Sequence, residues 1–270
     1  MNATEPSRVE GESGSPDANG AAQAGGRTNR QIGLIVAVAV VSLVASQIFG
    51  RRYSFFDMKI YHGAVEWWTS GGALYEYASP TSGLGFTYPP FAALSMLPMA
   101  LTSAVVAGWI NAIASTVALA VVLAALLPPI ADRLGWPRWL ALGVALPLAL
   151  AIEPTRETLG FGQVNLLLFA LVLADLVALR WRANGPPRVG TGPLTRFWYS
   201  GAWAGAGIGL ATAVKLTPGL FIVYLLVSRP WRTAVVASGT AAGASILAWV
   251  IAPKESLAYF TSVLWQTDRV

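Results

Sequence analysis

The sequence contains no cysteine and one histidine, His62, in 270 residues. Without cysteine there can be no disulfide framework, thiolate metal site or thiol nucleophile. A single histidine excludes a His-rich zinc site, and Ser-His-Asp chemistry would require His62 itself. Because the chain shows no convincing set of metal ligands, we predict neither a metal nor any other cofactor.

Charged residues are also scarce, at 11% of the chain, whereas hydrophobic residues make up 55%. So few charges could not cover the surface of a water-soluble protein of this size. The net charge of +5 does not indicate a nucleic-acid partner, because the basic residues lie in short connectors between apolar blocks. The composition therefore predicts an all-α, polytopic transmembrane helical bundle surrounded by membrane lipids.

The uncharged blocks give the expected spans. Residues 31–50 suit one crossing of the ~30 Å hydrocarbon core. The block at 91–127 is too long for one span and should break near Pro98 or at Leu101-Thr102-Ser103. Further blocks lie at about 139–152, 163–174, 201–214, 218–228 and 233–252. We predict a disordered cytoplasmic tail over 1–30 and one transmembrane domain over 31–270, with a long first external loop.

The distribution of Lys and Arg orients these blocks. If the amino terminus is cytoplasmic, 91–127 crosses once and 201–228 dips in and returns, eleven of the 18 basic residues lie inside. If instead 91–127 is a hairpin and 201–228 a single span, only six lie inside. We prefer the first topology, which places four segments on the outer face: 51–90, 153–162, 215–218 and 253–270. Seven of the 13 acidic residues fall in these segments: Asp57, Glu66, Glu76, Glu153, Glu157, Glu255 and Asp268.

The connector 51–90 is rich in aromatic residues, which are typical of an interfacial belt. Within it, Asp57 and Tyr61 lie four residues apart, on one face of a helix beginning near Phe55. A carboxylate flanked by two phenylalanines at the bilayer boundary loses solvation, which raises its proton affinity and suits a general base. Capping of a helix amino terminus explains Asp57 equally well.

Two further residues of this connector are candidates. His62 could bind phosphate or relay a proton, although a lone histidine is more often a surface or interfacial residue. Tyr88 precedes two prolines that enforce an extended approach to the next helix, and a simple helix start explains that pattern adequately.

A second candidate segment is 153–165. Gln163 and Asn165 open an apolar helix, where amides are costly unless they have partners. They could bind sugar hydroxyls, satisfy each other or cap the helix. Arg156 could pair with a phosphate or, equally well, with Glu153 or Glu157.

Lys215 is the third candidate, and no other charged residue occurs in 201–228. A lysine at the bilayer centre costs roughly 2.5–3.5 kcal/mol on insertion scales. The cost falls if Pro218-Gly219 breaks the helix and leaves the ammonium in a polar cavity. Such a cation predicts a site for an anionic headgroup, and snorkelling from a helix end is the alternative.

Common nucleotide motifs are missing from the sequence. It has no Walker A loop, no G-x-G-x-x-G after a strand and no Asp-x-Asp pair. An ATP-driven transporter or a sugar-nucleotide enzyme with a Rossmann domain is therefore not expected.

Five motifs, in order, resemble a known family: FFDMKIYHGA, GGALY, GFTYPPFAAL, ETLGFGQVN and GIGLATAVKLTPG. Over about 31–270 the chain resembles the polytopic GT-C glycosyltransferases of family 87. It is most similar to polyprenyl-phosphate-mannose-dependent α-(1→2)-mannosyltransferases, while related enzymes use polyprenyl-phosphate-arabinofuranose. The resemblance implies inverting transfer to a glycolipid acceptor of the phosphatidylinositol mannoside or lipomannan type. It also implies an active site at the outer face of a bacterial plasma membrane.

The resemblance maps the catalytic base onto Asp57. A lipid phosphate is already a good leaving group, so one base can suffice. From the residues themselves we assign the departing phosphate to Lys215, with Arg156 and His62 as weaker candidates. We assign substrate contacts to Tyr61, Gln163, Asn165 and Tyr88.

Family members continue beyond a segment like 264–270, so the resemblance leads us to expect a chain truncated at its carboxyl end. The rival hypothesis is a lipid or solute transporter in which Asp57 and Lys215 form a coupling pair.

Overall fold

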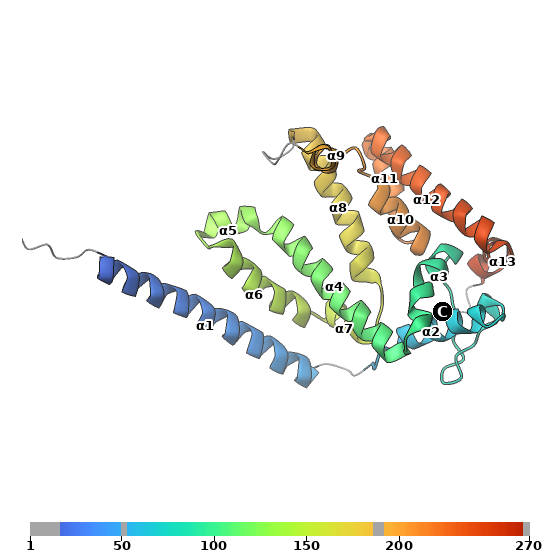
Figure 1. Ribbon diagram of the computed structural model, residues 1–270, viewed down its shortest axis with the longest axis horizontal. Helices are drawn as coiled ribbons and strands as arrows, with labels where there is room; N and C mark the ends of the chain where they lie inside the picture. The colour runs from blue at the N-terminus through green and yellow to red at the C-terminus, as the bar shows by residue number, and fades with distance from the viewer. Residues whose placement is uncertain (1–16, 50–52, 186–191, 267–270) are drawn as a thin grey trace, which may run out of the picture.

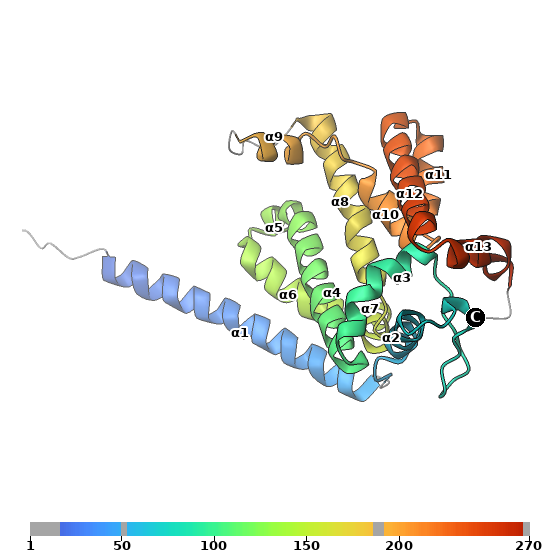
Figure 2. The same cartoon turned by 45° about the vertical axis from the view of Figure 1, so that its right-hand side comes forward.

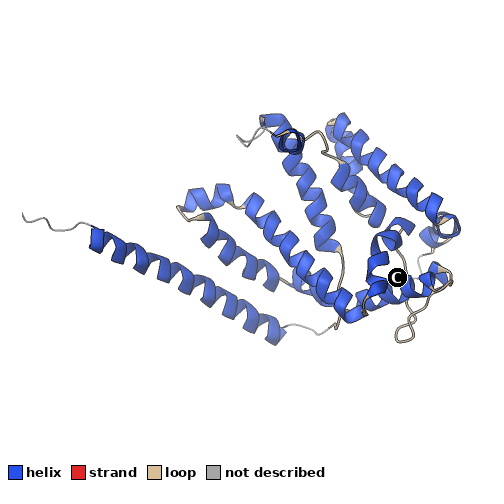
Figure 3. Cartoon of the chain, in the orientation of Figure 1, coloured by secondary structure: helices blue, strands red, loops and turns tan. Residues whose placement is uncertain are grey.

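The computed structural model describes residues 17–49, 53–185 and 192–266. Across these residues the chain forms helices and contains no strand (Figure 3), which confirms the all-α prediction. Three helices have segments long and apolar enough to cross a membrane: Gly25–Ile48 within α1 (Asp17–Phe49), α4 (Ala104–Leu126) and α12 (Trp231–Ile251). A fourth span results if α5 (Pro128–Leu134) and α6 (Arg138–Ala151), which meet at a 115° bend, count as one.

The remaining helices are shorter or carry charges. They are α2 (Phe56–Thr69), η1 (Leu74–Glu76), α3 (Pro90–Met96), η2 (Leu97–Leu101), α7 (Glu153–Phe161), α8 (Asn165–Asn184), α9 (Pro193–Tyr199), α10 (Ala206–Val214), α11 (Gly219–Ser228), α13 (Pro253–Thr261) and η3 (Val263–Trp265).

The first helix starts earlier than the sequence suggested. A disordered tail was predicted for 1–30, but α1 begins at Asp17, so that prediction is wrong for residues 17–30. Alanines recur in this stretch, and extending an existing helix costs far less than nucleating one. Residues 1–16 lie outside the described part of the chain.

The long uncharged block 91–127 breaks as predicted. It divides into α3, η2 and α4, with Pro98 inside η2 and the turn at Thr102-Ser103. Ser103 is the N-cap of α4, and its hydroxyl accepts a hydrogen bond of 3.3 Å from the Val106 amide. The block therefore holds one long helix, preceded by short segments that lie beside α2 and α12.

The stretch 201–228 forms the predicted break at 215–218. Helices α10 and α11 flank it and contact each other. Both are far shorter than the ~20 residues of a membrane span. In Figure 1 the chain descends partway through the molecule along α10 and returns along α11. This arrangement agrees with the preferred topology, in which the segment 201–228 enters the membrane and returns to the side from which it came.

Most of the candidate segments gather at one end of the bundle. In Figures 1 and 2, α2, α7, η1 and α13 lie at the end where α4 and α8 begin. Contacts between α2 and α7, and between α13 and η1, tie these segments together. Helices α5 and α9 lie at the other end. Which end faces the outside of a cell stays a prediction.

Helix α10 packs against its neighbours through glycines. A Cβ atom at Gly207 would lie 2.3 Å from the Leu171 carbonyl oxygen of α8. A Cβ at Gly209 would lie 2.4 Å from the Ala237 carbonyl oxygen of α12. Because no side chain fits there, α10 lies between α8 and α12 at a distance that only glycine allows.

Asp175 anchors the start of α10. This aspartate is fully buried in the middle of α8. Its Oδ2 atom accepts a 2.6 Å hydrogen bond from the Ile208 amide in the first turn of α10. A carboxylate at a helix amino terminus satisfies unpaired amides and complements the helix dipole. Asp175 thereby holds the start of α10 against α8.

Candidate active site

A chain of hydrogen bonds joins four of the predicted site residues. Gln163 donates from Nε2 to Asp57 Oδ2 at 2.5 Å, and Asn165 donates from Nδ2 to Gln163 Oε1 at 2.6 Å. Lys215 in turn donates from Nζ to Asn165 Oδ1 at 3.0 Å. The chain thus runs from a carboxylate on α2 to an ammonium at the end of α10. Mutual satisfaction of the two amides, one of the readings left open by the sequence, is part of this arrangement.

The turn after α7 places Gln163. Gly162 has a φ of 75°, and its amide bonds to the Leu159 carbonyl, while the Gln163 amide bonds to the Thr158 carbonyl. These two bonds form a Schellman motif, in which the residue with positive φ is usually glycine. The Gly-Gln pair of the sequence therefore ends α7 and directs the Gln163 side chain to Asp57.

Asp57 lies in the first turn of α2, whose start is fixed by α7. The Phe55 amide bonds to the Gly160 carbonyl at 2.9 Å, and Phe55 itself is the N-cap residue, with a φ of 58°. Asp57 therefore does not occupy the capping position that the sequence allowed. Its half-buried carboxylate instead accepts the Gln163 side chain, which fixes its orientation.

Lys215 lies at the break between α10 and α11. It is the C-cap of α10, with an extended backbone, and its side chain is half-buried. Besides the bond to Asn165, its Nζ atom lies 5.2 Å from the centroid of the Tyr88 ring, within cation–π range. The ammonium is thus held between two polar or aromatic partners, as the predicted helix break allows. Only one of its three hydrogens is used by Asn165.

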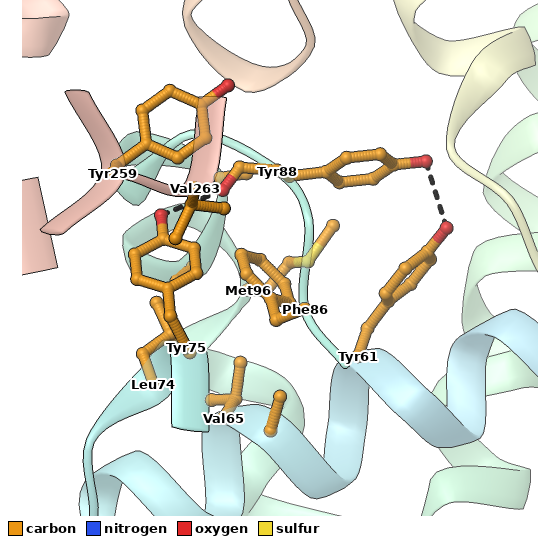
Figure 4. Packing of buried hydrophobic residues seen from close by; sticks show 12 residues of the cluster. Tyr61, Val65, Leu74, Tyr75, Phe86, Tyr88, Met96, Tyr259 and Val263 are labelled. Carbon is orange, nitrogen blue, oxygen red and sulfur yellow. Dashed lines mark hydrogen bonds between the residues drawn. The ribbon is translucent and has the colours of Figure 1, made fainter. Parts of the chain in front are cut away.

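Tyr61 and Tyr88 join the same site. Their hydroxyl oxygens lie 2.9 Å apart, as the dashed line in Figure 4 shows. Burial raises the pKa of Tyr61, and the nearby Tyr88 and Asp57 raise it further. Tyr61 therefore keeps its proton at neutral pH and remains a hydrogen-bond donor. The Tyr75 hydroxyl bonds to the Tyr88 carbonyl at 2.8 Å, which holds Tyr88 in place.

His62 and Arg156 contact other parts of the molecule. His62 Nε2 lies 2.6 Å from the Thr102 carbonyl oxygen, and its Nδ1 lies 3.7 Å from Glu66. Arg156 donates from Nη1 to the Ala151 carbonyl at 3.4 Å. The structure thus links His62 to the turn before α4 and Arg156 to the end of α6.

Asn111 is a polar residue of the site that sequence reasoning missed. It lies on α4, is 8% exposed and donates from Nδ2 to the Gln163 carbonyl at 3.1 Å. An amide within an uncharged helix is costly without a partner. The argument that identified Gln163 and Asn165 could therefore have identified Asn111 in the block 91–127.

An apolar cavity of about 620 Å³ opens beside Lys215. It lies along α8 and α11, with Asn165 and Lys215 among its few polar residues. Its apolar wall includes Leu168, Phe169, Leu220 and Tyr224. In the residues that the structure describes, no group of three His, Cys, Asp or Glu side chains could hold a metal ion.

Comparisons with known proteins show the family to which the sequence is similar. The family model described as glycosyltransferase family 87 matches residues 86–270. Similar curated proteins include two polyprenol-phosphate-mannose-dependent alpha-(1-2)-phosphatidylinositol mannoside mannosyltransferases. The one from Mycolicibacterium smegmatis is 30% identical over 255 residues, which cover 87% of this chain and 53% of the relative. The one from Mycobacterium tuberculosis is 31% identical over 259 residues, which cover 87% and 54%.

A third relative is a polyprenol-phosphate-mannose-dependent alpha-(1-2)-phosphatidylinositol pentamannoside mannosyltransferase of Mycolicibacterium smegmatis. It is 29% identical over 256 residues, which cover 92% of this chain and 56% of the relative. The chain therefore spans about half the length of the curated relatives it matches. No solved structure matches the chain at a significant level. The extent of the family match and the shared identity show that this membrane protein belongs to glycosyltransferase family 87.

Proposed function

We propose that the protein transfers mannose from a polyprenyl-phosphate-mannose donor to a glycolipid acceptor of the phosphatidylinositol mannoside type. Family membership and the names of the relatives support this reaction class and both substrates. The observation that carries the proposal for this chain is the hydrogen-bonded path from Asp57 to Lys215. It joins a carboxylate suited to accept a proton to a cation suited to bind a phosphate.

In this mechanism Asp57 is the general base. It takes the proton of the acceptor hydroxyl while that oxygen attacks the anomeric carbon of the donor mannose. The bond between the anomeric carbon and the phosphate oxygen breaks, and the lipid phosphate leaves with the electron pair. Attack opposite the leaving group inverts the anomeric configuration. The bond from Gln163 orients the carboxylate for this step, and positioning of this kind lowers the barrier.

Lys215 stabilises the departing phosphate. Its ammonium keeps two hydrogens beyond the one given to Asn165, and charge that develops on the phosphate is stabilised strongly in a site that excludes water. The cavity beside it suits the rest of the donor, because its lining is apolar and a polyprenyl chain is a long hydrocarbon. Tyr61 lies near Asp57, and Tyr88 and Asn165 lie beside Lys215, so these three side chains would bind sugar hydroxyls.

The predicted topology places this site at the outer face of a bacterial plasma membrane. The counting of basic residues supports that orientation, because the segments that this topology assigns to the inside hold eleven of the 18 basic residues. Donor and acceptor would then both reach the site from the outer leaflet.

The test is transfer of radiolabelled mannose from the lipid donor in membranes that contain the protein. Asp57→Asn removes the base and keeps the shape, so we expect the rate to fall roughly 10²–10⁴-fold. Asp132→Asn is the matched control, because Asp132 is exposed on α5 at the other end of the bundle. Transfer at the unaltered rate by Asp57→Asn would refute the role of Asp57. Solute transport without formation of a glycoside would refute the proposed reaction.

A further inference from the structure

A second cavity, of about 430 Å³ and with charged residues in its lining, lies at the far end of α2 from Asp57. It is formed by the end of α2, the turn into η1 and the start of α13, which the two views of Figures 1 and 2 show together. Its lining includes Trp68, Tyr75, Glu76, Lys254 and Glu255. The Trp68 indole donates from Nε1 to Glu255 Oε1 at 2.9 Å, which fixes the carboxylate across the cavity from α2.

The charges of this cavity differ from those beside Lys215. Two carboxylates and one ammonium, from Glu76, Glu255 and Lys254, give a net charge of −1 at neutral pH. The 620 Å³ cavity has a lysine and no acidic residue in its lining. A lipid phosphate is therefore attracted to the cavity beside Lys215 and repelled by the one at Glu255. A neutral, hydroxyl-rich ligand carries no such penalty, and carboxylates accept its hydroxyl hydrogens.

The aromatic wall also suits a sugar. Trp68 and the buried Tyr75 present flat apolar surfaces with polar tips, and such side chains contribute large contact areas. Tyr75 further belongs to a packed group of aromatic rings that includes Phe86, Tyr88 and Tyr259 (Figure 4). That group also holds Tyr61, which faces Asp57, so the cavity and the base are parts of one rigid unit.

The distance from this cavity to Asp57 determines which part of the acceptor the cavity can bind. Trp68 follows Asp57 by eleven residues on the same helix, which corresponds to about 16 Å at 1.5 Å per residue. One sugar unit cannot span that distance, whereas a glycan of several units can. We propose that the cavity at Trp68 and Glu255 binds the non-reacting sugar residues of the acceptor glycan, while the reacting hydroxyl lies at Asp57. This inference rests on the proposed function for its acceptor, and the binding of a sugar chain can be tested without transfer.

The first experiment measures binding of a soluble mannooligosaccharide to the detergent-solubilised protein by saturation-transfer NMR. Glu255→Gln removes the charge that accepts hydroxyl hydrogens, so the dissociation constant should rise at least about tenfold. Glu153→Gln is the matched control, because Glu153 is exposed on α7 and lies outside the cavity lining. Glu76→Gln is a second variant on an exposed side chain, and it should weaken binding in the same direction.

Inorganic phosphate provides a competition test. It should leave oligosaccharide binding unchanged, because the cavity carries net negative charge. Equal affinity of the native protein, Glu255→Gln and Glu76→Gln for the oligosaccharide would overturn the inference, as would displacement by phosphate.

The second experiment measures transfer kinetics. Glu255→Gln should raise the KM for the glycolipid acceptor about tenfold and leave the KM for the lipid donor unchanged. An equal change in both values would overturn the assignment to the acceptor. Absence of transfer together with Glu255-dependent oligosaccharide binding would refute the proposed reaction and support the sugar site, so the two failures are distinguishable.

Discussion

The two ends of the hydrogen-bonded chain belong to regions that pack in different ways. On the Asp57 side, large rings fill the interior in an aromatic cluster whose buried members are Tyr61, Ala64, Val65, Leu74, Tyr75, Phe86, Tyr88, Ala92, Ala93, Met96, Tyr259 and Val263. On the Lys215 side, the cluster is purely aliphatic and consists of Leu168, Val172, Ile208, Ala211, Leu225, Ala234 and Ala237. Glycines of α10 bring the backbones of this second region together.

This contrast follows from the residue that each region positions, which is Asp57 in the first and Lys215 in the second. Asp57, the proposed base, lies on the continuous helix α2, and packed aromatic rings fix that helix outside the long apolar spans. The cation lies where a helix is interrupted among apolar helices, and close backbone packing stabilises such helices in a membrane. Interrupting α10 at Lys215 creates space for the ammonium and for the adjacent cavity. Three substitutions test this comparison.

The largest effect is expected at the cation. Lys215→Met keeps the apolar stem and removes the charge, so kcat/KM for the lipid donor should fall roughly 10²–10³-fold. Lys59→Met is the control, because Lys59 is an exposed lysine on α2 and its loss should leave the rate nearly unchanged. The measurement is mannose transfer at varied donor concentration. Equal rates for the two variants would show that the charge at the break has no part in donor use.

A smaller effect is expected in the packing of α10. Gly207→Ala places a methyl group against the Leu171 carbonyl, so it should lower the free energy of unfolding by about 1–3 kcal/mol. Gly239→Ala on α12 is the matched control, because a Cβ there meets no atom within 4 Å. It should stabilise the helix by about 0.5–1 kcal/mol. Unfolding in detergent followed by circular dichroism measures both, and destabilisation of the same size in both would contradict close packing at Gly207.

The smallest effect is expected in the aromatic cluster at alkaline pH. Burial raises the pKa of Tyr259 from 10.0 to about 12. The folded state therefore holds this proton more tightly than the unfolded state, so stability is constant below pH 10 and falls as the pH rises toward 12. Compared with Tyr259→Phe, the native protein should lose roughly 1 kcal/mol at pH 11 relative to pH 8. Parallel pH profiles of unfolding for the two proteins would exclude this contribution.

Local sequence signals predicted many of the elements. The uncharged blocks gave the long helices, and Pro98, Ser103 and Pro218-Gly219 mark positions at or near the observed breaks. These signals act through the local backbone, because proline and glycine favour particular dihedral angles at their own positions. The sequence predicted a later start for α1 than Asp17, where the helix begins. The composition of residues 17–30 does not reveal a weak helical preference next to an apolar span.

The candidate site was predicted as a set of residues and not as an arrangement. Gln163 and Asn165 were noted because amides in apolar surroundings need partners. Asp57 was noted because two phenylalanines reduce its solvation, and Lys215 because a charge inside the bilayer is costly. Their order in one hydrogen-bonded chain depends on how α2, α7, α8 and α10 pack together, which no local pattern encodes. For the same reason the link from Asn111 to Gln163 and the cavity at Trp68 were missed, since each joins segments far apart in the sequence.

The sequence by itself determined that the protein is a helical membrane protein with few charges, because the cost of burying polar groups in lipid is set residue by residue. It also determined where helices must end and which polar groups are too costly to bury without a hydrogen-bond partner. Tertiary structure decided the partner of each such group, since a hydrogen bond depends on the position of two backbones at once. Asp57 and Lys215 face one site because α7 turns at Gly162 and α10 ends beside α8, and those contacts exist only in the packed bundle.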